Sequence, residues 1–328
     1  MHFDLLALGS GPAGQKAAVQ TAKLGKRAAV VERMATLGGV SIHAGTIPSK
    51  TLREAVIYLT GYHQRTFYGS SYAVNPDITM SDLMFRAEHV IRHEVEVTRN
   101  QLLRNNIEVL SGEASFVDAH TVEVAQAGGP RSLVTADRIV IATGSEAARS
   151  ADIPFDGKRV LISDELLHMP ELPPSLAIIG AGIIGTEYAG VFTALGIGVT
   201  LIDRRSRLLP FVDAEIGETL TKHLTDRGLV LHLNEDVAAI DGGSSEYVDL
   251  HLESGATVRA ETVLYCVGRV GATAGLNLAA AGIQADERGR IPVNSHFQTA
   301  VPHVYAAGDV IGSPALAATS MEQGRLAA

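Results

Sequence analysis

The sequence contains a single cysteine, Cys266, so an intramolecular disulfide cannot form. It has no run of about 18 apolar residues, so no transmembrane helix is expected. No run of Lys or Arg is longer than the pair Arg204-Arg205, and the formal net charge is −9. Neither a nucleic-acid partner nor a membrane surface is therefore expected, since both usually require a basic patch.

Other signals are missing as well. The first residues lead directly into an apolar segment, without the basic region and cleavage site of a signal peptide, so we expect a cytoplasmic location. The 12 histidines are scattered, and no metal site is predicted. Glycine, by contrast, is abundant, at 33 of 328 residues. This abundance indicates that the backbone needs glycine at particular turns.

An internal repeat shows where the glycines are needed. An apolar run at 5–8 precedes a glycine turn, a segment long enough for three helical turns, and a second apolar run that ends in an acid. The same pattern recurs 171 residues later. The matching residues are Gly9, Gly11, Gly14, Leu24, Gly25, Glu32 and Arg33 in the first copy, and Gly180, Gly182, Gly185, Leu195, Gly196, Asp203 and Arg204 in the second.

Each copy predicts a strand, a tight turn, a helix and a second strand. The first glycine permits the turn, the second lets the backbone approach a pyrophosphate, and the third lets helix and strand pack closely. The N–H groups and dipole of the helix N-terminus favour the pyrophosphate, and the acid accepts hydrogen bonds from a ribose. Two glycine turns that bind nothing are the alternative, but the complete context in both copies favours two dinucleotide sites.

Three later motifs extend the pattern. They are the segments 140–144 (VIATG), 264–269 (LYCVGR) and 304–309 (VYAAGD). In this order and spacing the chain resembles the two-dinucleotide flavoprotein disulfide reductases (pyridine nucleotide-disulfide oxidoreductases, class I). The resemblance implies an α/β fold with two Rossmann-like, three-layer ββα domains, the second inserted in the first. It implies an FAD-binding domain made of residues 1–147 and 271–328, and an NAD(P)-binding domain made of residues 148–270.

The loop 37–50 departs from the family at two positions. Relatives carry a redox cysteine pair there, and this chain has Ser41 and Thr46 instead, which cannot form a disulfide. The segments 45–56 and 309–312 are similar to those of the soluble pyridine nucleotide transhydrogenases. The resemblance implies FAD-dependent hydride transfer between NADPH and NAD⁺. An NAD(P)H oxidase or diaphorase and a non-catalytic dinucleotide-binding module are the alternatives.

The resemblance also implies site residues. Those for FAD are Gly9, Gly11, Pro12, Ala13, Gly14, Glu32, Arg33, Gly39, Thr46, Ser49, Lys50, Ala142, Thr143, Gly144, Gly308, Asp309 and Ala317. Those for NAD(P) are Gly180, Gly182, Ile183, Ile184, Gly185, Glu187, Asp203, Arg204 and Gly268. Arg33 is expected to face solvent, since FAD has no 2′-phosphate. Ile183 is either a flap over the nicotinamide pocket or a residue of the helix packing. A helix over 314–325 is expected to point its N-terminus at the flavin.

Lys50 and Glu187 are the predicted catalytic residues. By resemblance the Lys50 ammonium lies beside flavin N5, where it stabilises negative charge on reduced flavin. We expect the two residues to form a buried pair across the two domains. The alternative is that Lys50 is a solvated helix lysine.

At the second site the sequence contains residues that favour NAD and residues that could favour NADP. Asp203 favours NAD because it accepts bonds from the ribose hydroxyls and repels a 2′-phosphate. Arg204, Arg205 and Arg207 could bind that phosphate, or could form a solvated charge run.

One long amphipathic helix is predicted between Ser81 and Asn105. The resemblance further implies a C-terminal interface domain that builds a dimer, and nothing in the sequence up to Ala328 corresponds to it. Dimerisation through the family interface is therefore expected to be weak or absent.

Overall fold

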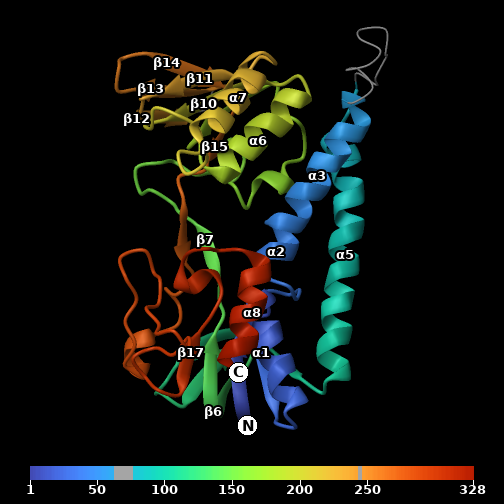
Figure 1. Cartoon of the computed structure of the whole chain (residues 1–328), viewed down its shortest axis with the longest axis vertical. Coiled ribbons are helices and arrows are strands. Elements are labelled where there is room, and N and C mark those ends of the chain that lie inside the picture. The colour runs from blue at the N-terminus through green and yellow to red at the C-terminus, as the bar shows by residue number, and fades with distance from the viewer. Residues whose placement is uncertain (63–76, 243–245) are drawn as a thin grey trace. The chain divides into compact units, whose positions relative to one another are not determined.

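Each copy of the repeat forms the strand, turn, helix and strand that the sequence predicts (Figure 1). The first copy builds β1 (His2–Leu8), α1 (Pro12–Lys23) and β2 (Ala28–Glu32), and the second builds β9 (Ser175–Ile179), α6 (Ile183–Ala194) and β10 (Gly198–Asp203). The two predicted acids, Glu32 and Asp203, are the last residues of their strands. Both acids therefore stand at the carboxyl ends of parallel strands, where ligands bind in open α/β sheets.

The structure is a computed structural model and describes residues 1–62, 77–242 and 246–328. Two compact units make up the chain. Unit 1 comprises Met1–Ile47, His89–Glu146 and Arg269–Ala328, and unit 2 comprises Pro48–Glu88 and Ala147–Gly268. The chain thus leaves unit 1 and returns to it.

Residues 48–88 group with unit 2, although the sequence assigned them to the first domain. The reason is the apolar face of helix α3 (Thr46–Leu59). Its residues Leu52 and Val56 are buried in the same core as Tyr188 and Phe192 of α6. Packing of one helix face, which composition does not reveal, decides which unit holds this segment.

Unit 1 is built on a mixed sheet. Strands β3 (Glu108–Ser111), β2, β1 and β6 (Arg131–Ile141) are parallel neighbours, and β17 (Val304–Ala306) pairs in parallel with the end of β6. The first half of β6 instead pairs antiparallel with β5 (Thr121–Ala125), which pairs with β4 (Glu113–Phe116). The long strand β6 therefore belongs to both a parallel and an antiparallel part of the sheet.

Alternating side chains of β1 separate two cores in unit 1. Leu5 and Ala7 lie in one core with Ala17 of α1. Leu6 and Leu8 lie in another core with Phe116 and with residues of the antiparallel strands. Since successive strand residues point to opposite faces, the parallel sheet lies between a helical layer and an antiparallel layer.

Unit 2 repeats this architecture. Its parallel strands follow the order β11 (Val230–Leu233), β10, β9, β15 (Thr262–Tyr265) and β8 (Val160–Ile162), beside an antiparallel sheet of β12 (Val237–Gly242), β13 (Val248–Leu252) and β14 (Thr257–Ala260). Ile178 packs with Tyr188 of α6, whereas Ile179 packs with Leu250 of β13. The predicted fold class, an α/β chain with two Rossmann-like three-layer domains, is confirmed.

The remaining elements join or cover these layers. They are α2 (Val40–His43), α5 (Met80–Arg104), β7 (Ser145–Ala147), η2 (Leu166–His168), α7 (Ala214–Thr225), β16 (Arg269–Gly271), η3 (Leu278–Ala281), η4 (Asp309–Ile311) and α8 (Ala317–Ala327). Helix α5 matches the predicted amphipathic helix, but its residues divide between the two units at Glu88. Helix α8 begins three residues after the predicted start, because Pro314 to Leu316 are not helical.

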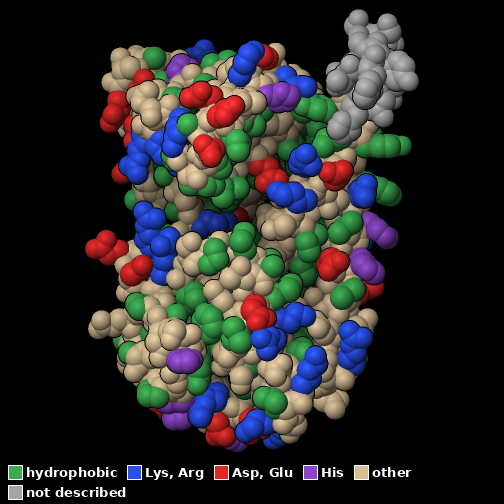
Figure 2. Space-filling view, in the orientation of Figure 1, with side chains coloured by type: hydrophobic (Ala, Val, Ile, Leu, Met, Phe, Trp, Pro, Cys, Tyr) green, Lys and Arg blue, Asp and Glu red, His purple; other side chains and the backbone are tan. Residues whose placement is uncertain are grey.

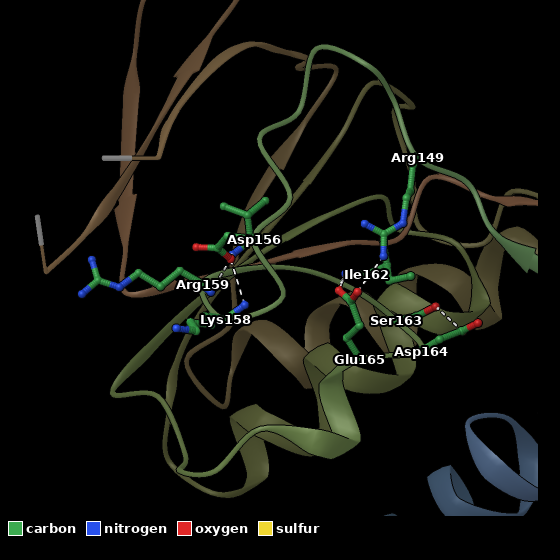
Figure 3. A network of polar contacts seen from close by, with 9 residues as sticks. Arg149, Asp156, Lys158, Arg159, Ile162, Ser163, Asp164 and Glu165 are labelled. Carbon is green, nitrogen blue, oxygen red and sulfur yellow. Dashed lines mark hydrogen bonds and ion pairs between the residues drawn. The ribbon is translucent and has the colours of Figure 1, made fainter. Parts of the chain in front are cut away.

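Polar contacts hold the segment that leads into β8 (Figure 3). Asp156 accepts hydrogen bonds from the backbone N–H groups of residues 158–160 at 2.8–2.9 Å. Burial would raise the pKa of Asp156, but these hydrogen bonds outweigh it and keep the pKa below its usual range. Glu165 accepts from the Arg149 guanidinium at 2.6 Å and from the Ile162 N–H at 3.1 Å. The segment is therefore tied at both of its ends.

Candidate functional site

The outer glycines of each turn are required by the fold itself. Gly9 has φ +108°, and a Cβ there would lie 2.4 Å from the Ala142 carbonyl oxygen. A Cβ on Gly14 would lie 1.9 Å from the Gly9 carbonyl oxygen. Gly180 and Gly185 repeat both constraints, with contacts of 2.7 and 1.9 Å. These four glycines let each strand, turn and helix pack closely, as the motif predicts.

The fold itself does not require glycine at the middle position of either turn. Gly11 has φ −67° and ψ −179°, and Gly182 has φ −76° and ψ −171°, values that any residue can adopt. A Cβ on either glycine would meet no atom within 4 Å. Both glycines are the N-caps of their helices, and neither α1 nor α6 has a side-chain cap or an acid in its first turn. The space beside each middle glycine is thus open, and among the described residues no side chain caps the N-terminus of either helix.

Both middle glycines fit a dinucleotide pyrophosphate. The helix N-terminus supplies N–H donors and a favourable dipole, and the missing Cβ leaves room for close approach. Pro12 and Ile183 are the first residues of the two helices. Ile183 is 63% exposed, which excludes its alternative assignment to the helix packing. Its role as a flap stays a prediction.

Glu32 is buried beside the first turn. Its Oε2 atom accepts hydrogen bonds from the backbone N–H and the hydroxyl of Ser10, at 3.0 and 2.5 Å. Its Oε1 atom accepts a hydrogen bond from the Met34 N–H at 2.8 Å. Arg33 is directed away to Glu146, at 4.0 Å, and its side chain is more than half exposed. The site therefore holds an oriented carboxylate that is not paired with a Lys or Arg side chain in the part of the chain that the structure describes.

Asp203 occupies the matching place at the second turn. Its Oδ2 atom accepts hydrogen bonds from the Ala181 N–H at 2.5 Å and Arg205 Nη2 at 2.6 Å. Its Oδ1 atom accepts from the Arg205 N–H and Nε, each at 2.8 Å. Burial would raise the pKa of Asp203, but these donors outweigh it and hold the pKa below its usual range. The same contact raises the pKa of Arg205.

The lowered pKa of Asp203 predicts an acid-sensitive contribution to stability. This contribution is present above the unfolded pKa of about 3.9 and is lost as pH falls through the folded pKa. We expect Asp203→Asn to lower the free energy of unfolding by about 1–3 kcal/mol near neutral pH. The difference from the unmutated protein should shrink below about pH 4. Urea unfolding at both pH values measures it, and a difference that does not depend on pH would contradict the assignment.

The predicted FAD residues near the end of the chain converge on Asp309. Its Oδ2 atom accepts a hydrogen bond from the Ser145 hydroxyl at 3.2 Å, and its Oδ1 atom accepts one from the Ser320 hydroxyl at 3.4 Å. Arg269 donates to Ser145 through Nε at 2.9 Å. Thr143 Oγ1 is buried and has no hydrogen-bond partner among the described residues. A ligand with hydroxyl groups fits this polar set.

Helix α8 lies tightly against α1. A Cβ on Gly324 would lie 2.0 Å from the Ala13 carbonyl oxygen, and Gly308 would meet the Ala13 side chain at 3.1 Å. Gly39, with φ +64°, would likewise meet the Cα atom of Gly11 at 2.9 Å. The predicted FAD residues Ala13, Gly39 and Gly308 thus surround the first turn, and Ala317 begins α8.

Lys50 and Glu187 form an ion pair. Lys50 lies in the first half of α3, and Glu187 lies in the first half of α6. The expectation of a buried pair across two domains is wrong in two respects. The Lys50 side chain is 54% exposed, and both residues belong to unit 2. The ion pair therefore holds the partly exposed Lys50 ammonium group near the start of α6, just after the second glycine turn.

The other predicted residues lie at helix starts, strand ends and turns. Thr46 and Ser49 lie at the start of α3, Ala142 is buried, and Gly144 and Gly268 have positive φ and open space. Ile184 is half-buried, and Arg204 is exposed. Sequence reasoning missed Ser10, Ser145 and Ser320, since single hydroxyl groups carry no motif, and it gave no role to Arg269 at the end of the 264–269 segment. It also missed the Asp203–Arg205 pairing.

The face in Figure 2 shows basic and acidic side chains interspersed. His89 and His93 stand one turn apart on α5, a spacing that metal ligands can have. Across residues 1–62, 77–242 and 246–328, however, no group of three or more His, Cys, Asp or Glu residues could hold a metal ion. No helix in these ranges is long and apolar enough to span a bilayer.

Comparison with known proteins agrees with this geometry. Residues 3–324 match the family described as pyridine nucleotide-disulphide oxidoreductase. The chain is 52% identical to the soluble pyridine nucleotide transhydrogenase of Mycobacterium bovis and 43% identical to that of Yersinia enterocolitica, covering 100% of this chain and 70% of each relative. Among solved structures, the flavoprotein disulfide reductase RclA of Escherichia coli has a TM-score of 0.87 at 30% identity, covering 100% of this chain and 70% of that one. LpdA of Mycobacterium tuberculosis has a TM-score of 0.90 at 27% identity, covering 98% and 71%.

Proposed function

Because the chain belongs to the pyridine nucleotide-disulphide oxidoreductase family, we propose that it transfers hydride between NADPH and NAD⁺ through FAD. The observation that carries the proposal is the pair of middle glycines. Gly11 and Gly182 are glycine where the fold allows any residue, and each stands before an uncapped helix N-terminus. A ligand that approaches the backbone at each helix N-terminus explains both.

We assign FAD to unit 1 and the nicotinamide dinucleotide to unit 2. Glu32 has acceptor capacity for a ribose hydroxyl, and Asp309, Thr143 and Ser145 supply polar groups for the remainder of a flavin nucleotide. Bound FAD supplies a flavin that accepts a hydride and returns it. The assignment corresponds to FAD binding by 1–147 and 271–328 and NAD(P) binding by 148–270, with 48–88 as the exception.

The residues at the two former cysteine positions fit hydride exchange without a dithiol. The Ser41 hydroxyl donates to the Gly38 carbonyl at 3.2 Å, and Thr46 begins α3. Neither side chain can be oxidised to a disulfide. We propose that reducing equivalents pass only between flavin and nicotinamide, with Lys50 stabilising the negative charge of the reduced flavin. The names of the two transhydrogenase relatives agree with this reaction. Cytoplasmic location and weak dimerisation stay predictions.

Anaerobic mixing tests the reaction. Protein loaded with FAD is mixed with NADPH and a thionicotinamide analogue of NAD⁺, whose reduced form absorbs separately from NADPH. We expect the analogue to be reduced in equal amount to the NADPH oxidised, over many turnovers. Oxidation of NADPH that requires oxygen or a quinone, with no reduction of the analogue, would instead establish an oxidase or diaphorase.

A further inference from the structure

The two copies of the repeat treat their acids differently, although their backbones agree. In each copy the acid accepts a hydrogen bond from the N–H that follows the first glycine, that of Ser10 or Ala181. In each copy it also accepts one from the N–H two residues beyond itself, at 2.8 Å. The side chain at this second position is Met34 in one copy and Arg205 in the other. Comparing the two copies therefore shows how one arginine side chain changes the hydrogen bonding of the acid.

Glu32 retains room for a ligand. A carboxylate has about four acceptor positions, two on each oxygen. The Ser10 N–H and hydroxyl occupy Oε2, and the Met34 N–H occupies one position on Oε1. Because the Met34 side chain offers no donor and is 57% exposed, one position on Oε1 is left for a ribose hydroxyl.

Asp203 has no such room. Arg205 Nε and the Arg205 N–H occupy Oδ1, and Arg205 Nη2 and the Ala181 N–H occupy Oδ2. All four acceptor positions are therefore filled by the protein. The Asp203 side chain is only 4% exposed, whereas that of Arg205 is 40% exposed. A ribose hydroxyl can reach the carboxylate only after the guanidinium has moved.

We infer that Arg205 determines which dinucleotides the second site accepts. This inference rests on the proposed function, because it concerns the adenosine ribose of the nicotinamide dinucleotide. A ribose with a free 2′-hydroxyl displaces the guanidinium and donates to Asp203. A ribose with a 2′-phosphate draws the guanidinium to the phosphate, to which arginine can donate two hydrogen bonds. The two neutral backbone donors keep Asp203 hydrogen-bonded in both cases.

Among the described residues, neither neighbouring arginine is paired with Asp203. Arg207 donates from Nη2 to the Pro210 carbonyl at 2.7 Å, and Arg204 is exposed. The backbone of the Arg205 segment is held, since the Arg205 carbonyl accepts from the Asn234 N–H at 3.1 Å and the Asp203 carbonyl accepts from the Glu235 N–H at 3.1 Å. A change of partner by Arg205 therefore requires motion of its side chain alone.

The test uses Arg205→Met, which gives the second copy the side chain of the first. Titration calorimetry on FAD-loaded protein measures the binding of ADP-ribose and of 2′-phospho-ADP-ribose, neither of which carries a nicotinamide. We expect affinity for the phosphorylated fragment to fall about 10- to 100-fold, because a charge-assisted contact is lost. Affinity for ADP-ribose should be equal or higher, because acceptor positions become free. Arg227→Met is the matched control, because Arg227 is an exposed arginine of the same unit outside the predicted site, and it should leave the ratio of the two affinities within about threefold.

The outcomes separate the inference from the proposed function. Unmutated protein that bound neither fragment would overturn both. Binding of both fragments, with a ratio that Arg205→Met leaves unchanged, would overturn the inference alone. The reciprocal variant Met34→Arg should lower FAD affinity about 10-fold by filling the free position on Glu32. Unchanged FAD affinity in a folded Met34→Arg protein would contradict the account of acceptor positions.

Discussion

Gly11→Ala is expected to fold normally and to lose FAD, whereas Gly14→Ala is expected to damage the fold. The backbone at Gly11 suits alanine, and its Cβ would meet no protein atom within 4 Å. That Cβ would instead occupy the space of a bound pyrophosphate. Loss of two charge-assisted hydrogen bonds from the helix N-terminus would weaken FAD binding about 10²-fold or more.

Gly14→Ala, by contrast, should destabilise the fold and should not obstruct the ligand directly. A Cβ on Gly14 would lie 1.9 Å from the Gly9 carbonyl oxygen, so α1 would have to move away from the turn. We expect the free energy of unfolding to fall by about 3 kcal/mol or more. Circular dichroism on heating measures stability, and the flavin absorbance of the purified protein measures FAD content.

The second repeat provides the matched controls. Gly182→Ala should keep FAD and the fold but lose NAD(P) binding, and Gly185→Ala should lower stability in the same way as Gly14→Ala. Full FAD affinity in a stably folded Gly11→Ala protein would show that the middle glycine has no role in binding.

Lys50→Met is expected to slow reduction of the bound flavin by NADPH about 10- to 100-fold. A donor fully shielded from water contributes roughly 10²–10³ in rate, and the partly exposed Lys50 should contribute less. We propose an electrostatic effect on the reduced flavin, so the flavin reduction potential should also become more negative. Anaerobic stopped-flow absorbance measures the rate, and a redox titration measures the potential.

Two variants distinguish the charge of Lys50 from its position. Lys50→Arg keeps the positive charge and should retain most of the rate. Glu187→Gln removes the carboxylate that holds Lys50, and it should lower the rate less than Lys50→Met while leaving the potential shifted in the opposite direction. A Lys50→Met protein with unchanged rate and unchanged potential would eliminate Lys50 from the reaction.

The repeat explains why much of the site could be predicted. The positions of the glycines and acids follow from backbone geometry, which short motifs record directly. A Cβ on Gly9, Gly14 or either of their counterparts would lie 1.9–2.7 Å from a backbone carbonyl oxygen, either a few residues away or at the end of a neighbouring strand. Glu32 and Asp203 end their strands as the pattern requires. Local sequence therefore contained the necessary information.

The features that the sequence did not predict are of two kinds. Some depend on contacts between residues far apart in the sequence, and others depend on which of several similar side chains makes a contact. Helix α3 joins unit 2 because of apolar residues that pack against α6, more than 100 positions away in the sequence. Three arginines after Asp203 have the same appearance in sequence, and only the structure shows that Arg205 folds back onto the acid. Exposure of Lys50 likewise depends on tertiary packing.

Counting bound nucleotides tests the central claim most directly. Purified protein is reconstituted with FAD, then titrated with NADPH and with NAD⁺, and native mass spectrometry counts the ligands on each chain. We expect one FAD and one nicotinamide dinucleotide per chain, with Gly11→Ala losing the first and Gly182→Ala losing the second. Protein that stays colourless after reconstitution, or that binds a single nucleotide shared between both turns, would contradict the account.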